Sequence, residues 1–260
     1  MTARSDLRID GVSVRFEGLT ALDGVSIEVP QGQVVGVIGP NGAGKTTLFN
    51  VICGFVRPDA GTIRWRGEPL GKVRPHQLAR LGIARTVQGV RLFPHLTALE
   101  NVMLGADHLH RPGLAAALLG LPRSDRAERA LREVALEALE SLGVADAAER
   151  PAGELAFGVA KRVALARALV ARPVLVMLDE PAGGLGADDV EELAALIRRL
   201  RESMSVMLVE HRMDLVMSVC DHVAVLDSGR LIAAGPPEAV KSDQRVLEAY
   251  LGAEVDGSDA

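Results

Sequence analysis

Apolar and polar residues alternate in three short segments near the start of the chain. The segments 7–16, 25–29 and 61–67 show this two-residue period, and turn residues separate them. Alternation of this kind is typical of strands that bury one face. The pattern therefore predicts a small antiparallel sheet.

Four other segments are almost continuously apolar. They read VVGVIG at 34–39, VLVMLD at 174–179, VMLVEH at 206–211 and HVAVLD at 222–227. Runs like these favour strands that are buried on both faces, as in a parallel sheet covered by helices. Helical patterns lie between the runs, so the main body is predicted to be of the α/β class.

The middle of the chain, from about Leu96 to Leu155, carries helical patterns and few strand patterns. Asp125 and Glu128 have the spacing of a capping box at a helix start. Apolar residues follow at steps of three and four, as on one face of a helix: Ala127, Leu131, Val134, Ala138 and Leu142. This region is predicted to be a helical insert in the α/β core.

Composition narrows the class of protein. The 260 residues are 48% hydrophobic and 24% charged, which is ordinary for a globular protein with a buried core. The net charge of −5 argues against a general nucleic-acid binder. Two cysteines give neither a disulfide framework nor a metal-binding spacing. No signal peptide is visible, and the longest apolar stretch, 113–121, is about half of the ~18 residues that a membrane span needs.

The strongest local signal is GPNGAGKT, from Gly39 to Thr46, which matches G-x-x-x-x-G-K-[ST]. It follows a buried strand and opens a helical run, which is the context that the motif requires. A glycine-rich loop can point its backbone N–H groups at phosphate oxygens, and the helix adds its positive N-terminal end. Lys45 is expected to reach the β- and γ-phosphates, and the Thr46 hydroxyl to bind Mg²⁺. An accidental match in a glycine-rich turn is the alternative.

The segment VLVMLDE supplies two acids where an apolar strand ends. Asp179 is expected to hold Mg²⁺ directly or through water. Glu180 is expected to orient or deprotonate the attacking water. Two acids after a strand are a weak signal by themselves, but they become persuasive beside a phosphate-binding loop.

With these motifs, residues 7–251 resemble the ATP-binding-cassette (ABC) ATPases. The resemblance implies that Phe16 stacks on adenine and that Gln88, in the Q-loop, senses Mg²⁺ and the attacking water. It also implies that Ala182–Gly186 forms the D-loop and that His211 is the switch histidine on the γ-phosphate. Alone, Phe16 would be a core residue, Gln88 a surface residue and His211 an ordinary residue at a strand end. Their common order and spacing favours the ATPase.

The resemblance implies one ABC ATPase domain over residues 1–260, with the P-loop NTPase fold, an antiparallel β subdomain and a helical insert. Its nucleotide-binding core is expected at 7–95 and 160–235, its helical subdomain at 96–159, and a C-terminal helix and tail at 236–260. Mg²⁺ is expected on Thr46, Gln88 and Asp179. The residues expected to bind ATP are Phe16, Gly39, Pro40, Asn41, Gly42, Ala43, Gly44, Lys45, Thr46, Thr47, Ala156, Phe157 and Gly158, and the catalytic ones Glu180, His211 and Gln88.

Leu155–Val159, in ELAFGVAKRVALARAL, falls at the position of the family's signature, which usually reads L-S-G-G-Q. Ala156 lacks the hydroxyl, Phe157 replaces a glycine, Gly158 is kept and Val159 lacks the amide. Helical residues 159–172 are expected to follow, so that the helix N-terminus still presents N–H groups to a phosphate. Losing one hydrogen bond to a charged group costs roughly 1.5–3 kcal/mol, so we expect a weakened half-site.

Within the family, the stretch ARTVQGVRLFPHLTALENVMLG, the phrase DEPAGGL and the late AYLG resemble the branched-chain amino-acid uptake ATPases. Urea-type and lipopolysaccharide-export ATPases share parts of this pattern. The resemblance implies a peripheral subunit on the cytoplasmic face of the membrane. Its partners would be a second ATPase subunit, identical or different, two transmembrane permease subunits and, indirectly, a periplasmic or lipoprotein solute-binding protein, with no nucleic acid.

Two other functions compete with transport. Soluble ABC ATPases of translation or DNA repair usually carry two cassettes or long coiled-coil inserts, and the chain has neither. A nucleotide-dependent binding module without turnover is favoured only by the altered signature. Asp179, Glu180 and His211 argue against it.

Overall fold

The computed structural model of the chain describes residues 5–86, 89–106 and 122–256, and the chain divides into two units. The first consists of residues 1–78 and 177–260, and the second of residues 79–176. The predicted helical insert, 96–159, lies within the second unit. The segment 113–121 and Gln88 lie outside the described residues. In the part of the chain that is described, no helix is long and apolar enough to cross a membrane.

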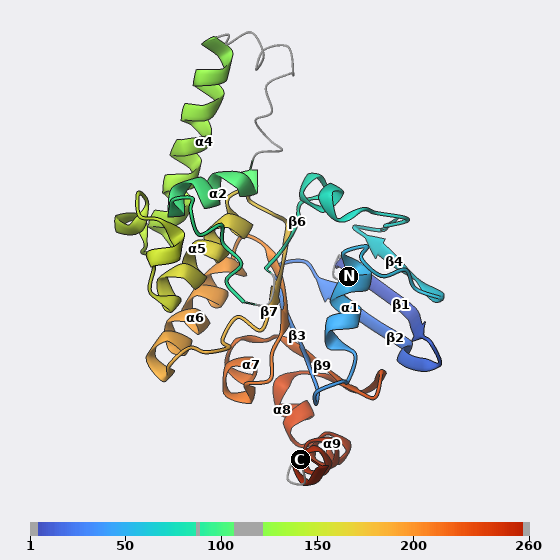
Figure 1. Ribbon diagram of the computed structural model, residues 1–260. Helices are drawn as coiled ribbons and strands as arrows, with labels where there is room; N and C mark the ends of the chain where they lie inside the picture. Colours follow the sequence, from blue (N-terminus) through green and yellow to red (C-terminus); the bar gives the residue numbers. More distant parts are fainter. Residues whose placement is uncertain (1–4, 87–88, 107–121, 257–260) are drawn as a thin grey trace. The chain divides into compact units, whose positions relative to one another are not determined.

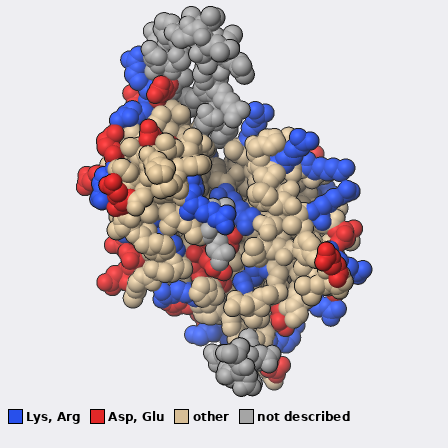
Figure 2. Space-filling view, viewed as in Figure 1, with Lys and Arg blue, Asp and Glu red and all other residues tan. Residues whose placement is uncertain are grey.

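An antiparallel sheet forms from the alternating segments. Its strands are β1 (Ser5–Phe16), β2 (Leu19–Pro30), β4 (Ala60–Trp65) and β5 (Glu68–Pro69), in the order β2-β1-β4-β5. Leu7 and Ile9 of β1 are buried, whereas Arg8 between them is exposed. Figure 2 shows Lys and Arg gathered over this part of the surface. Arg8 pairs in register with Arg64 of β4. The predicted antiparallel sheet is therefore confirmed.

The apolar runs form the parallel strands of the larger sheet. They are β3 (Val34–Ile38), β7 (Leu175–Asp179), β8 (Ser205–Val209) and β9 (His222–Asp227). With β10 (Arg230–Gly235) they lie in the order β10-β9-β3-β8-β7, and β3 runs parallel to both β8 and β9. Every residue of β3, β7 and β8 is buried, as the continuous apolar pattern predicts.

Helices cover the parallel strands of the first unit. Figure 1 shows α1 (Lys45–Ile52) on the side toward the antiparallel sheet, and α6 (Ala187–Leu200) and α7 (Met213–Val219) on the opposite side. The chain continues into α8 (Pro237–Lys241) and α9 (Gln244–Asp256). A buried polar contact joins the two sheets, because the hydroxyl of Ser205, the first residue of β8, donates to Asp6 of β1 at 2.6 Å. The expected α/β class is confirmed.

The second unit is mainly helical, as predicted. It holds β6 (Ile83–Arg85), α2 (Ala98–Ala106), α4 (Pro122–Ser141), α5 (Phe157–Leu169) and the short 3₁₀ turns Ala145–Ala147 and Ala152–Glu154, while another such turn, Pro75–Leu81, spans the unit boundary. Thr97 and Glu100 form a capping box at the start of α2, in which the Glu100 carboxylate accepts from the Thr97 N–H at 2.8 Å. Hydrogen bonds from the Thr97 N–H and hydroxyl to the carboxylate lower the pKa of Glu100.

The expected start of the long helix is wrong. Asp125 and Glu128 predict a start near 125, whereas α4 begins at Pro122. Proline is well suited to the first helical position, because its missing N–H has no intrahelical partner there. Of the predicted face, Leu142 is buried and Leu131, Val134 and Ala138 are half-buried, whereas the fully buried helix residues are Ala135 and Leu139, which the prediction did not include. The predicted three-and-four spacing therefore finds the packed side of the helix only in part.

Candidate functional site

The phosphate-binding motif forms a loop between β3 and α1. Gly39 has φ +149° and lies where a Cβ would meet the carbonyl oxygen of Leu226 at 2.0 Å. Gly44 has φ +100°, and a Cβ there would meet the carbonyl oxygen of Ala21 at 2.5 Å. Neighbouring backbone therefore leaves no space for a larger residue at either end of the loop. The loop's course is fixed by glycine at both ends.

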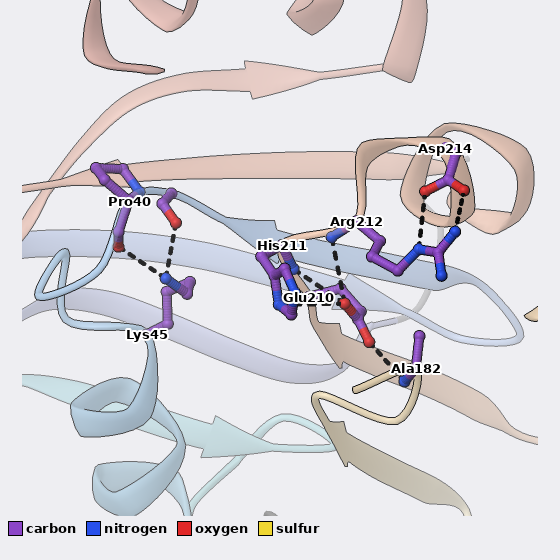
Figure 3. A network of polar contacts seen from close by, with 8 residues as sticks. Pro40, Lys45, Ala182, Glu210, His211, Arg212 and Asp214 are labelled. Carbon is purple, nitrogen blue, oxygen red and sulfur yellow. Dashed lines mark hydrogen bonds and ion pairs between the residues drawn. The ribbon is translucent and has the colours of Figure 1, made fainter. Parts of the chain in front are cut away.

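Lys45 is the first residue of α1 and is buried. Its Nζ donates to the carbonyl oxygens of Gly39 and Pro40 at 2.7 and 2.8 Å, as Figure 3 shows. Burial lowers the pKa of Lys45, and the negative charge of Glu180 opposes that shift. An ammonium has three donors, so two bonds to the loop leave one for a phosphate oxygen. The carbonyl oxygens of the loop thus hold the Lys45 ammonium group at the loop.

Asp179 ends β7 and Glu180 follows it, while Glu210 and His211 follow the neighbouring strand β8. The Glu180 N–H donates to the Val209 carbonyl at 2.9 Å, which joins the ends of the two strands. Glu180 has φ +47°, a left-handed conformation that is rare outside glycine and common at functional sites. Asp179 is buried and Glu180 is half-buried. The predicted acids therefore lie at the sheet edge at which the phosphate loop begins.

His211 is held by its backbone and leaves its ring accessible. Its side chain is 57% exposed, and its N–H donates to Glu210 Oε2 at 3.0 Å. The His211 Nδ1 lies 3.7 Å from the same oxygen. The neighbouring Arg212 donates two hydrogen bonds to Asp214, one to each carboxylate oxygen. These bonds lower the pKa of Asp214. An exposed imidazole beside a buried carboxyl can turn toward a phosphate.

Phe16 ends β1, and the hairpin of β1 and β2 brings Ala21 against Gly44. Phe16 is 45% exposed. It is therefore not a core residue, which was the alternative to a role in adenine binding. An accessible aromatic ring close to a phosphate loop is suited to stacking on a base. Gln88 lies outside the described residues, so the structure does not place it.

Leu155–Val159 lies in the second unit, at the start of α5. The expected helix limits, 159–172, are wrong at both ends, because α5 runs from Phe157 to Leu169. Ala156 has φ −56° and ψ 147°, the extended conformation of an N-cap residue, so the helix begins directly after it. At the other end Pro173 disfavours helical geometry in Arg172, which has φ +49°.

This placement gives the altered signature a structural meaning. With Ala156 as N-cap, Val159 occupies the third helical position. The usual S-G-G-Q would put Ser and Gln at these two positions, which is the spacing of a capping box. The structure records no side-chain cap at Ala156. Phe157 is 49% exposed, and Lys161 Nζ lies 5.2 Å from the centre of its ring. The helix therefore keeps its N–H groups but lacks both capping side chains.

Restoring the two side chains tests this interpretation. We expect Ala156→Ser with Val159→Gln to stabilise the chain by about 1 kcal/mol, because both satisfy N–H groups at the start of α5. Thermal unfolding of the purified chain measures this, with Ala187→Ser at the exposed start of α6 as a control for adding a serine. An unchanged melting temperature contradicts the capping-box geometry. In the pair of ATPase subunits that the resemblance implies, Val159→Gln is expected to raise turnover or ATP affinity. If neither turnover nor ATP affinity changes, the half-site formed by Leu155–Val159 is not weakened by the loss of the glutamine.

The comparisons with known proteins identify the family. Residues 22–183 match the family model described as ABC transporter. The chain belongs to the ABC transporter family. It is therefore an ABC ATPase that binds and hydrolyses ATP, and the resemblance drawn from its motifs is confirmed.

Residues 230–256 also match a family described as branched-chain amino acid ATP-binding cassette transporter. A high-affinity branched-chain amino acid transport ATP-binding protein, BraF of Pseudomonas aeruginosa, is 44% identical, with 96% of this chain and 99% of that protein covered. LivG of Escherichia coli, whose name gives the same function, is 40% identical over 95% and 97%. A crystal structure of a nucleotide-free ATP-binding cassette from an ABC transporter superposes with a TM-score of 0.83 at 33% identity, over 95% and 98%.

One buried acid of this ABC ATPase was not singled out from the sequence. Glu210 is 0% exposed and accepts hydrogen bonds from backbone on two loops. The signal was present, because a charged residue at the end of a buried strand needs partners. It lies in VMLVEH directly before His211.

Proposed function

We propose that this chain energises the uptake of branched-chain amino acids, as the ATP-hydrolysing subunit of an importer. The observation that carries the proposal is the match of residues 230–256 to the branched-chain family, beyond the ATPase core that many transporters share. Near full-length similarity to BraF and LivG, which bear that function in their names, supports it further. Export of another substrate lacks such support.

In the proposed site, Lys45 and the loop Gly39–Gly44 bind the phosphates of ATP. Thr46 is an exposed residue at the start of α1, and Asp179 ends β7. Their oxygens fit Mg²⁺, which prefers one or two protein ligands together with phosphate oxygens. Mg²⁺, when bound, neutralises charge on the phosphates. Gln88 is the third proposed ligand of Mg²⁺, and Asn41 and Thr47 are proposed to bind ATP.

Glu180 accepts a proton from the attacking water in this proposal, and His211 contacts the γ-phosphate. The strained backbone of Glu180 and the exposed ring of His211 support these roles. Phe16 stacks on adenine. The negative charge of Glu180 opposes the fall in the pKa of Lys45. This carboxylate is therefore well placed to act beside the phosphates.

The signature residues Ala156, Phe157 and Gly158 are proposed to act on the ATP held by a second ATPase subunit. The N-terminal N–H groups of α5 would contact phosphate there, because the first turn of a helix leaves them without intrahelical acceptors. The pair of ATPase subunits would bind two permease subunits at the cytoplasmic face of the membrane. A solute-binding protein would deliver the amino acid to the permeases.

Co-purification tests the assembly. We expect the tagged chain, captured from detergent-solubilised membranes, to bring two polytopic membrane proteins and an ATPase partner with it. Capture should survive nuclease treatment. Recovery only as a soluble protein, or with nucleic acid, contradicts a transport role and favours a soluble ABC ATPase.

A further inference from the structure

Glu210 is a buried carboxyl for which the proposed mechanism has no role. It follows β8 directly, is 0% exposed, and lies between the loops that carry Glu180 and His211. A buried carboxyl is costly unless hydrogen bonds compensate for its lost hydration. Its partners therefore indicate what it does.

One oxygen of Glu210 holds the backbone around the histidine. Oε2 accepts from the N–H groups of His211 and Arg212 at 3.0 and 3.3 Å (Figure 3). These bonds fix the chain at the point where the exposed His211 ring begins. The ring itself stays able to turn, because its Nδ1 is 3.7 Å from the carboxyl.

The other oxygen holds the loop after the catalytic acid. Oε1 accepts from the N–H of Ala182 at 2.7 Å, two residues beyond Glu180 (Figure 3). At Glu180 itself, the backbone N–H donates to the Val209 carbonyl at 2.9 Å. Glu180 is therefore anchored on both sides while its own backbone has φ +47°. Strained residues persist where their surroundings fix them, as these two bonds do.

We propose that Glu210 is a positioning residue that sets the location of Glu180 relative to His211, and so links the D-loop to the switch histidine. The proposal rests on the roles proposed above for Glu180 and His211. It explains why a carboxyl is needed. All three partners are N–H donors, and they approach both oxygens. An amide at this position offers one oxygen and one donor group, so it must release either Ala182 or the pair His211 and Arg212.

The test compares Glu210→Gln with Glu202→Gln, which makes the same change at an exposed residue after α6. The assembled transporter is assayed for ATP turnover and for the KM of ATP, and the chain for its melting temperature. We expect Glu210→Gln to lower kcat at least 10-fold while KM stays within about twofold, because the phosphate loop is not altered. Glu202→Gln should match the unchanged chain.

A kcat within twofold of the unchanged transporter overturns the proposal. So does a parallel loss of kcat and ATP affinity, since that indicates a general structural role. If Glu210→Gln does not fold, Glu210→Asp decides by the same criteria, because it keeps two accepting oxygens on a shorter side chain. Glu180→Gln is measured alongside. If that variant retains turnover, the proposed catalytic role fails, whereas loss with Glu180→Gln but not with the Glu210 variants defeats only the positioning role.

Discussion

Glu180→Gln is expected to lower ATP turnover by the assembled transporter at least 100-fold while ATP still binds. The amide keeps the size and shape of the carboxylate but cannot take a proton from the attacking water. Positioned general bases typically contribute factors of about 10²–10⁴ in rate. ATP binding should persist, because the loop Gly39–Gly44 and Lys45 are unchanged. Phosphate release measures turnover, and equilibrium binding of a fluorescent ATP analogue measures affinity.

The control for this substitution is Glu202→Gln, which removes the same charge at an exposed site after α6 and should leave turnover unchanged. Full turnover in Glu180→Gln would show that another group activates the water. In that event the assignment of Glu180 as the base is wrong, although the ATP-binding loop would be unaffected.

The second large effect is expected for Gly39→Ala, which should abolish ATP binding. A Cβ at this position would lie 2.0 Å from the Leu226 carbonyl oxygen, and the backbone has φ +149°. No side-chain rotation can relieve a clash with a backbone atom. The loop or β9 must therefore move, and the carbonyl of Gly39 that accepts from Lys45 moves with it.

Gly67→Ala is the matched control, because Gly67 also has positive φ, +92°, but a Cβ there would meet nothing within 4 Å. It should lose only the roughly 1–2 kcal/mol that a left-handed alanine costs, and keep its ATP affinity. Isothermal titration with ATP, together with thermal unfolding, separates the two variants. Equal ATP affinity in both would mean that the contact between Gly39 and β9 does not shape the loop.

The parallel strands, the phosphate loop and the two acids at the end of β7 could be predicted because each is encoded within a few adjacent residues. A continuous apolar run reports burial on both faces, and glycines at fixed spacing report a tight loop. Local signals were also present for one strand that was not predicted. β9 ends at Asp227 and β10 begins at Arg230, and Ser228 and Gly229 between them both have positive φ. A Ser-Gly turn of this kind marks a hairpin.

The role of Glu210 could not be predicted in the same way, because its partner Ala182 is 28 residues away. That contact exists only because β7 and β8 are neighbours in the sheet, which no local pattern states. The limits of α5 also depended on more than its apolar spacing. Ala156 acts as N-cap without a capping side chain, so the residue types that usually mark a helix start are missing.

Uptake by the reconstituted transporter tests the central claim most directly. The chain is assembled with its permease subunits and ATPase partner in proteoliposomes, with ATP on the side of the ATPase and solute-binding protein and radiolabelled leucine on the other. We predict leucine accumulation that requires ATP and is lost with Glu180→Gln but retained with Glu202→Gln. ATP hydrolysis that neither responds to leucine nor moves it across the membrane would contradict branched-chain amino-acid uptake.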